Sequence, residues 1–144
     1  TIAFLYLLRI MKRTLLLTIA LTLFSVFAAH SEEKVLLFDA FKNADANAIS
    51  TYFNDNIEMT LPNAQNFFTK SQARGILADF FKKNQVLDFT VLHTGNKENS
   101  AFTIGNLKTV NGIYRVSFFA RKVPNAAKKQ IYLLRIEKSL ESEK

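Results

Sequence analysis

The sequence predicts an α+β fold in which helices pack on one face of a curved antiparallel sheet. Apolar residues recur first with helical spacing and later, from residue 88, in steps of two. The resulting order is two helices, a strand, a third helix and then four strands. Such runs of one element type are typical of α+β folds rather than of folds with strict strand–helix alternation. Because a curled sheet under a helix layer leaves a wedge-shaped space, the fold class also predicts where a ligand could bind.

The first two helices are predicted from one apolar stripe and one cap. The first covers residues 34–44, and the second runs from Asp45 to Phe53. Asp45 suits the cap because its carboxylate can accept a hydrogen bond from the free N–H groups of the first turn. The residues expected on the buried faces of these helices are Leu37, Phe38, Phe41, Ile49, Tyr52 and Phe53.

The third helix begins at Thr69, which forms a capping box with Gln72. Residues 82–84, two lysines and an asparagine, suit its C-terminus. Gly75 inside the helix costs about 1 kcal/mol relative to Ala, which indicates close packing of the backbone at that point. The residues expected on its buried face are Ala73, Ile76, Leu77, Phe80 and Phe81.

Alternating segments predict five strands, and Asn111-Gly112 between two of them predicts a hairpin. The first strand ends at Pro62, which cannot donate a ladder hydrogen bond. The strands cover residues 57–61, a segment from 88, and 101–110, 113–122 and 130–137, and residues 140–144 form a polar tail. The residues expected to share a face within one strand are Phe89, Val91 and His93; Tyr114, Val116, Phe118 and Ala120; and Tyr132, Leu134 and Ile136.

Residues 11–31 have the pattern of a signal peptide. Met11-Lys12-Arg13 supplies a positive start, residues 14–27 supply an apolar core, and Ala29-His30-Ser31 supplies small residues at the cleavage positions. We therefore expect translation to start at Met11, so that residues 1–10 are upstream sequence wrongly included in the chain. We expect residues 32–144 to be a single domain, periplasmic or secreted. The alternative is that residues 2–27 are retained as a membrane anchor, although basic residues interrupt that run.

Composition excludes several classes of function. The chain has no cysteine, which rules out disulfides, thiolate metal sites and a thiol nucleophile. Without the basic residues of its first 31 positions, the chain carries 16 basic and 12 acidic residues, a net charge of +4. The bases concentrate in residues 108–144, which we interpret as a solvated face, with an anionic partner as the alternative. We expect no nucleic-acid partner and, after removal of the signal, no membrane.

Several short segments resemble a known family. They are Lys70-Ser71-Gln72-Ala73, Ile76-Leu77, Phe80-Phe81, Phe89, His93, Gly95, Ile104-Gly105 and Gly112-Ile113-Tyr114-Arg115-Val116. With the element order, they resemble a family of small exported Bacteroidota proteins of unknown function that has the nuclear-transport-factor-2-like cone, also called SnoaL-like or cystatin-like. The resemblance covers residues 35–137. It implies a fold and an export route but no activity, since that superfamily includes isomerases, dehydratases, transport factors and dimerisation modules.

The candidate pocket takes its residues from the inner surface of the predicted cone. His93 is the one histidine of the domain, and its imidazole would suit proton transfer if a partner oriented it; the alternative is a hydrogen-bonded core residue. No residue set has the spacing of a catalytic triad, a metal site or a cofactor site. The pocket residues are therefore predicted without a catalytic role: Tyr52, Phe81, His93, Tyr114 and Arg115.

The second face of the predicted sheet carries large apolar groups. Phe119 points away from Phe118 and shares its face with Ile113, between arginines. An apolar patch on the open face of a single-layer sheet indicates an interface, so we expect a homodimer through the sheet. The alternative is a scattered pair of exposed apolar side chains.

The sequence thus favours a non-enzymatic exported domain that binds a small apolar or anionic ligand or another protein. The alternative is an isomerase- or dehydratase-like enzyme that uses a cavity histidine with a tyrosine or an acid. Geometry separates these hypotheses. His93 beside a Tyr and a buried acid would favour the enzyme, an open apolar pocket would favour ligand binding, and a packed interior would favour an interaction module.

Overall fold

The computed structural model describes residues 1–140, and it describes the side chains of all of these except residues 20–33. Most of the predicted signal peptide, including Ala29-His30-Ser31, therefore lies outside the described side chains, and residues 141–144 of the predicted tail lie outside the described residues. The elements in chain order are α1 (Ile2–Lys42), α2 (Ala46–Ser50), β1 (Phe53–Leu61), β2 (Ala64–Thr69), α3 (Lys70–Lys83), β3 (Val86–Asn96), β4 (Ser100–Thr109), β5 (Gly112–Arg121) and β6 (Gln130–Lys138).

The chain divides into two units, Thr1–Leu36 and Leu37–Lys144. The first unit is helical from Ile2 onward, and its apolar side chains up to Ile19 are exposed. Among the helical residues that the structure describes, no stretch is long and apolar enough to cross a bilayer. The second unit contains the end of α1 and every other element.

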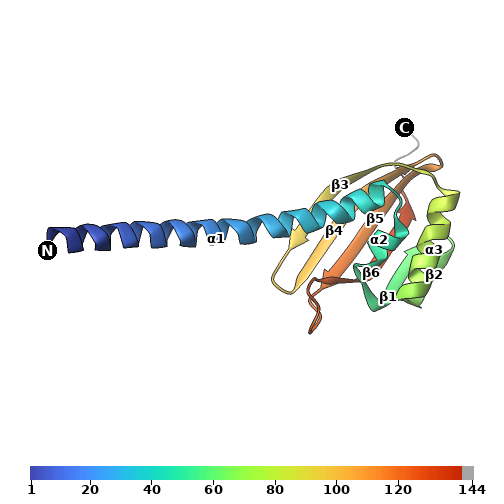
Figure 1. The fold of residues 1–144 in the computed structure, drawn as a ribbon. Coiled ribbons are helices and arrows are strands. Elements are labelled where there is room, and N and C mark those ends of the chain that lie inside the picture. The colour runs from blue at the N-terminus through green and yellow to red at the C-terminus, as the bar shows by residue number, and fades with distance from the viewer. Residues whose placement is uncertain (141–144) are drawn as a thin grey trace. The chain divides into compact units, whose positions relative to one another are not determined.

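The second unit is a six-stranded sheet with helices on one face (Figure 1). The strand order is β2-β1-β6-β5-β4-β3, and neighbours are antiparallel except for β1 and β6, which are parallel. The α+β class and the helices on one face are confirmed. The prediction missed β2, because this short strand carries exposed polar residues beside Phe67 and has no clear alternation. It also ended the second helix too late, since Phe53 already begins β1.

Local signals in the sequence set the starts of α2 and α3, as predicted, whereas the helix predicted over residues 34–44 is the end of the longer α1. The Asp45 carboxylate accepts a hydrogen bond from the Ala48 N–H at 2.9 Å and starts α2. Thr69 and Gln72 form the predicted capping box, in which each side chain accepts a hydrogen bond from the other's backbone N–H at 3.3 and 3.0 Å. Gly75, however, is exposed, and a Cβ atom there would meet nothing within 4 Å. The predicted close packing at Gly75 is therefore wrong.

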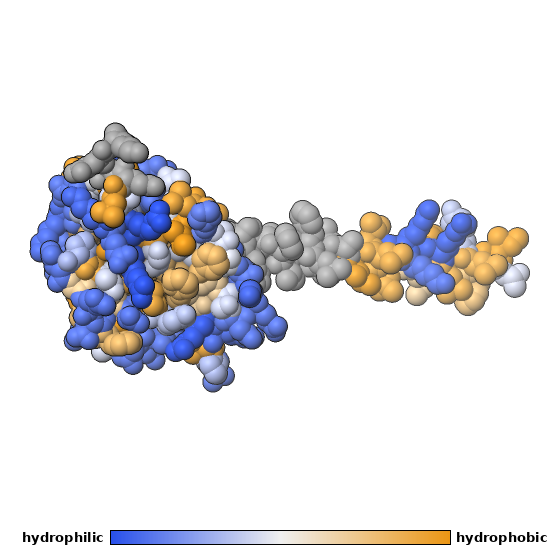
Figure 2. All heavy atoms as spheres, turned by 180° about the vertical axis from the view of Figure 1, so that it is seen from behind, coloured by the Kyte–Doolittle hydropathy of each residue, from blue (hydrophilic) through white to orange (hydrophobic). Residues whose placement is uncertain are grey.

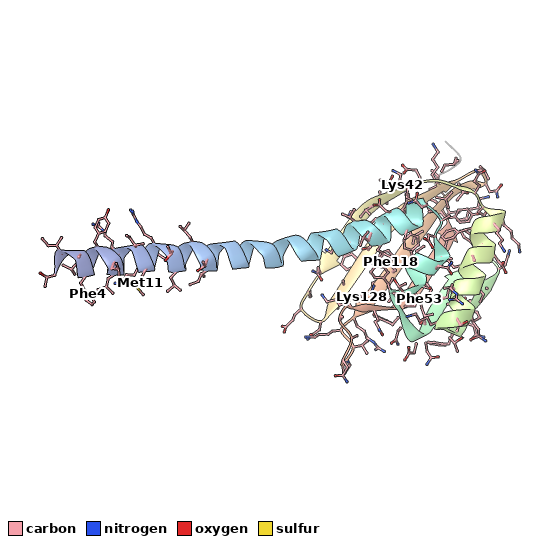
Figure 3. All side chains as sticks on the ribbon, in the orientation of Figure 1. Phe4, Met11, Lys42, Phe53, Phe118 and Lys128 are labelled. Carbon is pink, nitrogen blue, oxygen red and sulfur yellow. The ribbon has the colours of Figure 1, made fainter. Side chains whose placement is uncertain are left out.

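Phenylalanine side chains fill the space between the helices and the sheet (Figure 3). Phe41 of α1 is fully buried and stacks on Phe89 of β3 and on Phe118 of β5, with ring centroids 5.1 and 5.6 Å apart. Phe53 and Leu77 are also fully buried. The wedge that the fold class predicts is thus occupied by the chain's own side chains at its centre.

Candidate functional site

A pocket of about 430 Å³ lies beside the C-terminal half of α3. One wall is the turn between β1 and β2, and another is formed by the start of β5 and the turn that precedes it. The apolar residues of the lining are Leu61, Pro62, Ala64, Ile76 and Phe80, and the polar ones are Asn63, Asp79, Lys83, Asn84, Asn111 and Tyr114. The pocket therefore combines an apolar surface with a row of hydrogen-bonding groups, as small-molecule sites do.

The polar wall of this pocket is a hydrogen-bond network centred on Asn84. The Asn84 Oδ1 atom accepts hydrogen bonds from the Tyr114 hydroxyl and from the Asn111 Nδ2 group, both at 3.0 Å. Asn84 Nδ2 donates to the Phe80 carbonyl at 3.0 Å, and Asn111 Nδ2 also donates to the Lys83 carbonyl at 2.9 Å. The network ties the end of α3 to the β4–β5 turn.

Tyr114 is the one member of the predicted pocket set that lines this pocket. Its ring is buried and meets Phe80 edge to face, with centroids 5.2 Å apart. Phe81 is buried next to Phe80, at 5.9 Å, but is absent from the lining. Tyr52 lies near the start of β6, whereas Tyr114 pairs with Lys138 at the end of that strand. The Tyr52 carbonyl accepts a hydrogen bond from the Ile131 N–H, and its ring lies 3.6 Å from the Lys128 ammonium.

His93 lies on the opposite face of the sheet from Tyr114. The sequence predicted that His93 shares a face with Phe89 and Val91, but the pairing of β3 with β4 shifts between Val91 and His93. This β-bulge inserts Leu92 and turns His93 outward, opposite Ile104, where it is exposed. The prediction that His93 is on the inner face is therefore wrong.

Arg115 is also exposed on the outer face of the sheet, in register with Glu137 of β6. A second bulge, between β5 and β6, places Ile131 in the core and Tyr132 against Arg121, whose guanidinium lies 5.0 Å from the ring centroid. The prediction that Tyr132 shares a face with Leu134 and Ile136 is therefore wrong. Among the described residues, no three acidic or histidine side chains are grouped to hold a metal ion.

The outer face carries one apolar row that crosses the strands. In register, Phe67 of β2 lies opposite Glu58 of β1, Glu58 opposite Leu133 of β6, Leu133 opposite Phe119 of β5, and Phe119 opposite Phe102 of β4. Phe102 and Phe119 stack with centroids 6.2 Å apart. Phe67 is 72% exposed and Phe102 is 38% exposed. Figure 2 shows this side of the molecule, where apolar side chains gather among charged ones.

One carboxylate next to the core has a shifted pKa. The Lys42 ammonium lies 3.1 Å from the Asp88 carboxylate, and this contact, with a hydrogen bond from the Phe89 backbone, lowers the pKa of Asp88 below its ordinary value of 3.8. The pair joins the end of α1 to β3. It lies apart from the pocket and from the apolar row, so we assign it to stability.

The predicted pocket set did not include four polar residues that line this pocket, Asn84, Asn111, Asp79 and Lys83. The two asparagines were interpreted as a helix end and a turn, which both are. Their positions 27 residues apart gave no sign that their side chains meet. The available signal was only that both residues are asparagines, one at the end of a helix and the other in an Asn-Gly turn.

Comparison with known proteins identifies the family. Residues 36–137 match the family described as Domain of unknown function (DUF4783). The chain belongs to this family. A crystal structure of a DUF4783 family protein from Bacteroides ovatus is 34% identical in sequence, with a TM-score of 0.68, and the match covers 74% of this chain and 94% of that one. The predicted resemblance to a Bacteroidota family of unknown function is thereby confirmed.

More distant structures share the DUF4783 fold alone. An NTF2-like protein of unknown function from Cytophaga hutchinsonii is 11% identical with a TM-score of 0.51, over 73% of this chain and 85% of that one. A domain of unknown function with a cystatin-like fold from Nostoc punctiforme is 10% identical with a TM-score of 0.60, over 78% of this chain and 76% of that one. No curated protein gives a significant match. The DUF4783 chain therefore has an NTF2-like fold, to which these comparisons attach no activity.

Proposed function

We propose that this DUF4783 protein is an exported, non-catalytic interaction domain that pairs with a second copy of itself through the outer face of its sheet. The observation that carries the proposal is the apolar row Phe67–Leu133–Phe119–Phe102, which crosses five strands with only Glu58 between its members. Exposed aromatic residues beside arginines are the composition of the buried centres of protein interfaces. The packed interior supports the same hypothesis.

The charges on the outer face suit a two-fold symmetric contact. The face carries Arg115, Arg121 and Arg135 on two neighbouring strands, and Glu58 and Glu137 on the same side. The ion pairs found among the described side chains, Lys42–Asp88 and Lys82–Asp79, involve none of these five residues. In a two-fold dimer the same patch meets itself, so an arginine of one copy can face a glutamate of the other.

The size of the face is sufficient for a stable dimer. Six strands at about 4.8 Å spacing, of which the central β5 and β6 have ten and nine residues, give a face of roughly 25 by 30 Å. Such a face can bury about 800 Å² on each partner, which is the usual size of a specific interface.

Export is the second part of the proposal. The first unit has bases at positions 9, 12 and 13 followed by exposed leucines, a pattern that supports a signal peptide. The mass of the protein recovered from the periplasm or the medium of an expressing bacterium tests this. A chain that begins at Glu32 supports cleavage after Ser31, whereas an intact chain in the membrane fraction would support the anchor instead.

The alternative enzyme receives no specific support. A histidine base and a tyrosine act together only within hydrogen-bond reach, and His93 and Tyr114 lie on opposite faces of one sheet.

Sedimentation equilibrium over a range of concentrations tests the dimer. The protein produced from the full chain is expected to dimerise, and Phe67→Asp is expected to raise the dissociation constant at least roughly ten-fold, because it places a charge in an apolar contact in both copies. Phe67 is already exposed, so the folded monomer tolerates the change. Val110→Asp is the matched control, since Val110 is 55% exposed but lies in the β4–β5 turn.

Two results would overturn the dimer. The first is a monomer at every concentration up to about 1 mM, where even a weak interface is populated. The second is an equal weakening by Phe67→Asp and Val110→Asp, which would show that added charge rather than the outer face controls association.

A further inference from the structure

The polar wall of the pocket offers hydrogen-bond acceptors in fixed positions. The Tyr114 hydroxyl hydrogen is donated to Asn84, so the oxygen retains lone pairs that can accept. Both hydrogens of the Asn111 amide are donated, to Asn84 and to the Lys83 carbonyl, and its Oδ1 atom is left to accept. The carbonyl of Lys83 also fixes the orientation of this amide, because the opposite orientation would bring two oxygens together. A complementary ligand must therefore donate several hydrogen bonds.

The two charged residues that line the pocket have opposite signs, and the carboxylate of Asp79 also lies 3.9 Å from the Lys82 ammonium outside the lining. Asp79 and Lys83 stand one helical turn apart on α3 and carry opposite signs. An anionic ligand would meet Asp79, and a cationic ligand would meet Lys83, so neither sign is favoured. The second hydrogen of the Asn84 amide and the Lys83 ammonium can donate to a ligand oxygen. A neutral group that both donates and accepts, the hydroxyl, fits all of these side chains.

The other wall of the pocket is apolar and suits carbon–hydrogen surfaces. Leu61 and Pro62 form the β1–β2 side, and Ile76 and Phe80 form the helix side. The volume of about 430 Å³ lies in the range of sites for small molecules. A ligand with hydroxyl groups on one side and carbon–hydrogen bonds on the other, as in a pyranose ring, matches both walls.

We propose that this pocket binds a neutral polyhydroxyl compound of the size of a mono- or disaccharide. The network around Asn84 holds the hydrogen-bonding groups in place before the ligand arrives, which reduces the entropy lost on binding. The site belongs to the end of the fold near the β4–β5 turn, and its lining takes no residue from the apolar row of the outer face. Sugar binding therefore does not depend on the dimer.

Nuclear magnetic resonance titration of the ¹⁵N-labelled protein, produced from the full chain, tests the site. The probes are glucose, galactose, N-acetylglucosamine and maltose, with glucuronate and inorganic phosphate as charged counterparts, each to about 50 mM so that a weak site with a millimolar constant is saturated. At least one neutral sugar is expected to shift the side-chain amide signals of Asn84 and Asn111. The charged probes are expected to bind more weakly than their neutral counterparts.

Three variants locate the binding. Tyr114→Phe keeps the ring and removes the hydroxyl, and is expected to weaken binding roughly five-fold, the value of one neutral hydrogen bond. Asn111→Ala removes an acceptor and loosens the network, and is expected to weaken binding roughly ten-fold or more. Asn47→Ala changes an exposed asparagine on α2 and is the matched control, with no change expected.

The outcomes separate this proposal from the dimer. Retained sugar binding in Phe67→Asp supports an independent pocket whether or not the chain dimerises. The proposal is overturned if no neutral sugar shifts the amide signals, if a charged probe binds more tightly than the neutral ones, or if Tyr114→Phe in a folded protein leaves the affinity unchanged. If Asn111→Ala disturbs the β4–β5 hairpin, the sugar affinity of Tyr114→Phe alone decides whether the proposal holds.

Discussion

The two faces of β5 differ in what covers them. Tyr114, Val116, Phe118 and Ala120 point inward and are buried beneath the chain's own helices. Arg115, Ser117, Phe119 and Arg121 point outward, and only neighbouring strands flank them. Both faces contain a phenylalanine, in adjacent positions of the same strand. Of these two phenylalanines, Phe118 is buried in the core and Phe119 remains half-exposed on the outer face.

The first prediction tests this difference by truncating one phenylalanine from each side. Phe41→Ala is expected to lower the free energy of unfolding by about 3–5 kcal/mol, because it removes a fully buried ring that stacks on two others. Phe119→Ala, on the half-buried outer face, is expected to cost only about 1 kcal/mol in the monomer. Urea unfolding at low protein concentration measures both. Equal losses would mean that the outer face is part of the core.

Two glycines on opposite faces provide a second comparison. A Cβ atom at Gly105 would lie 2.7 Å from the buried Phe89 ring and 2.8 Å from the Thr90 carbonyl oxygen. Gly105→Ala is therefore expected to destabilise the fold by about 1–3 kcal/mol.

Gly95 is the matched control on the outer face. A Cβ atom there would overlap the Phe102 ring, whose nearest carbon would be 2.2 Å away, but that ring is partly exposed and can rotate outward. Gly95→Ala is expected to cost less than about 1 kcal/mol. A larger loss at Gly95 than at Gly105 in urea unfolding would contradict the assignment of the faces.

The third prediction concerns an exposed helix position that lies on neither face of the sheet. Gly75 lies on the exposed side of α3, where a Cβ atom would meet nothing within 4 Å. Gly75→Ala is expected to stabilise the fold by about 1 kcal/mol through helix propensity and a smaller loss of chain entropy. Thermal unfolding measures the change, and a loss of stability would restore the close packing that the sequence suggested.

The smallest expected effect comes from the Lys42–Asp88 pair. The folded state favours the charged carboxylate, so the pKa of Asp88 is lower in the folded than in the unfolded chain. The contribution of this carboxylate to the free energy of unfolding is present above pH 3.8, its ordinary pKa. That contribution is lost as the pH falls through the lower pKa of the folded chain. Asp88→Asn is expected to flatten the pH dependence of stability in this acid range slightly. Asp39→Asn, an exposed change on α1, is the control, and an equal flattening by it would contradict the assignment.

Local signals account for the parts of the fold that the sequence predicted. The Asp45 cap, the Thr69–Gln72 capping box and the hairpin at Asn111-Gly112 depend on residues within a few positions of one another. The strand β2 was missed because its edge position leaves its polar residues exposed. His93 was placed on the wrong face because a bulge depends on the partner strand, and one inserted residue reverses every later side chain.

The candidate pocket could not be predicted for a related reason. Asn84 and Asn111 were visible as a helix end and a turn, but their meeting requires the end of α3 to lie against the β4–β5 hairpin. Of the predicted pocket residues, Tyr114 lines the pocket beside α3.

The sequence by itself determined the α+β class, the order of the elements other than β2, the helix caps, the β4–β5 hairpin and the family, because propensity, capping and alternation are short-range properties. It also determined that β5 carries apolar residues on both faces. Only the tertiary structure decided the strand order, the filled centre of the cone, the outward turn of His93 and the union of Asn84, Asn111 and Tyr114 in one pocket. These features depend on pairings between residues far apart in the chain, and such pairings are set by how the whole core packs.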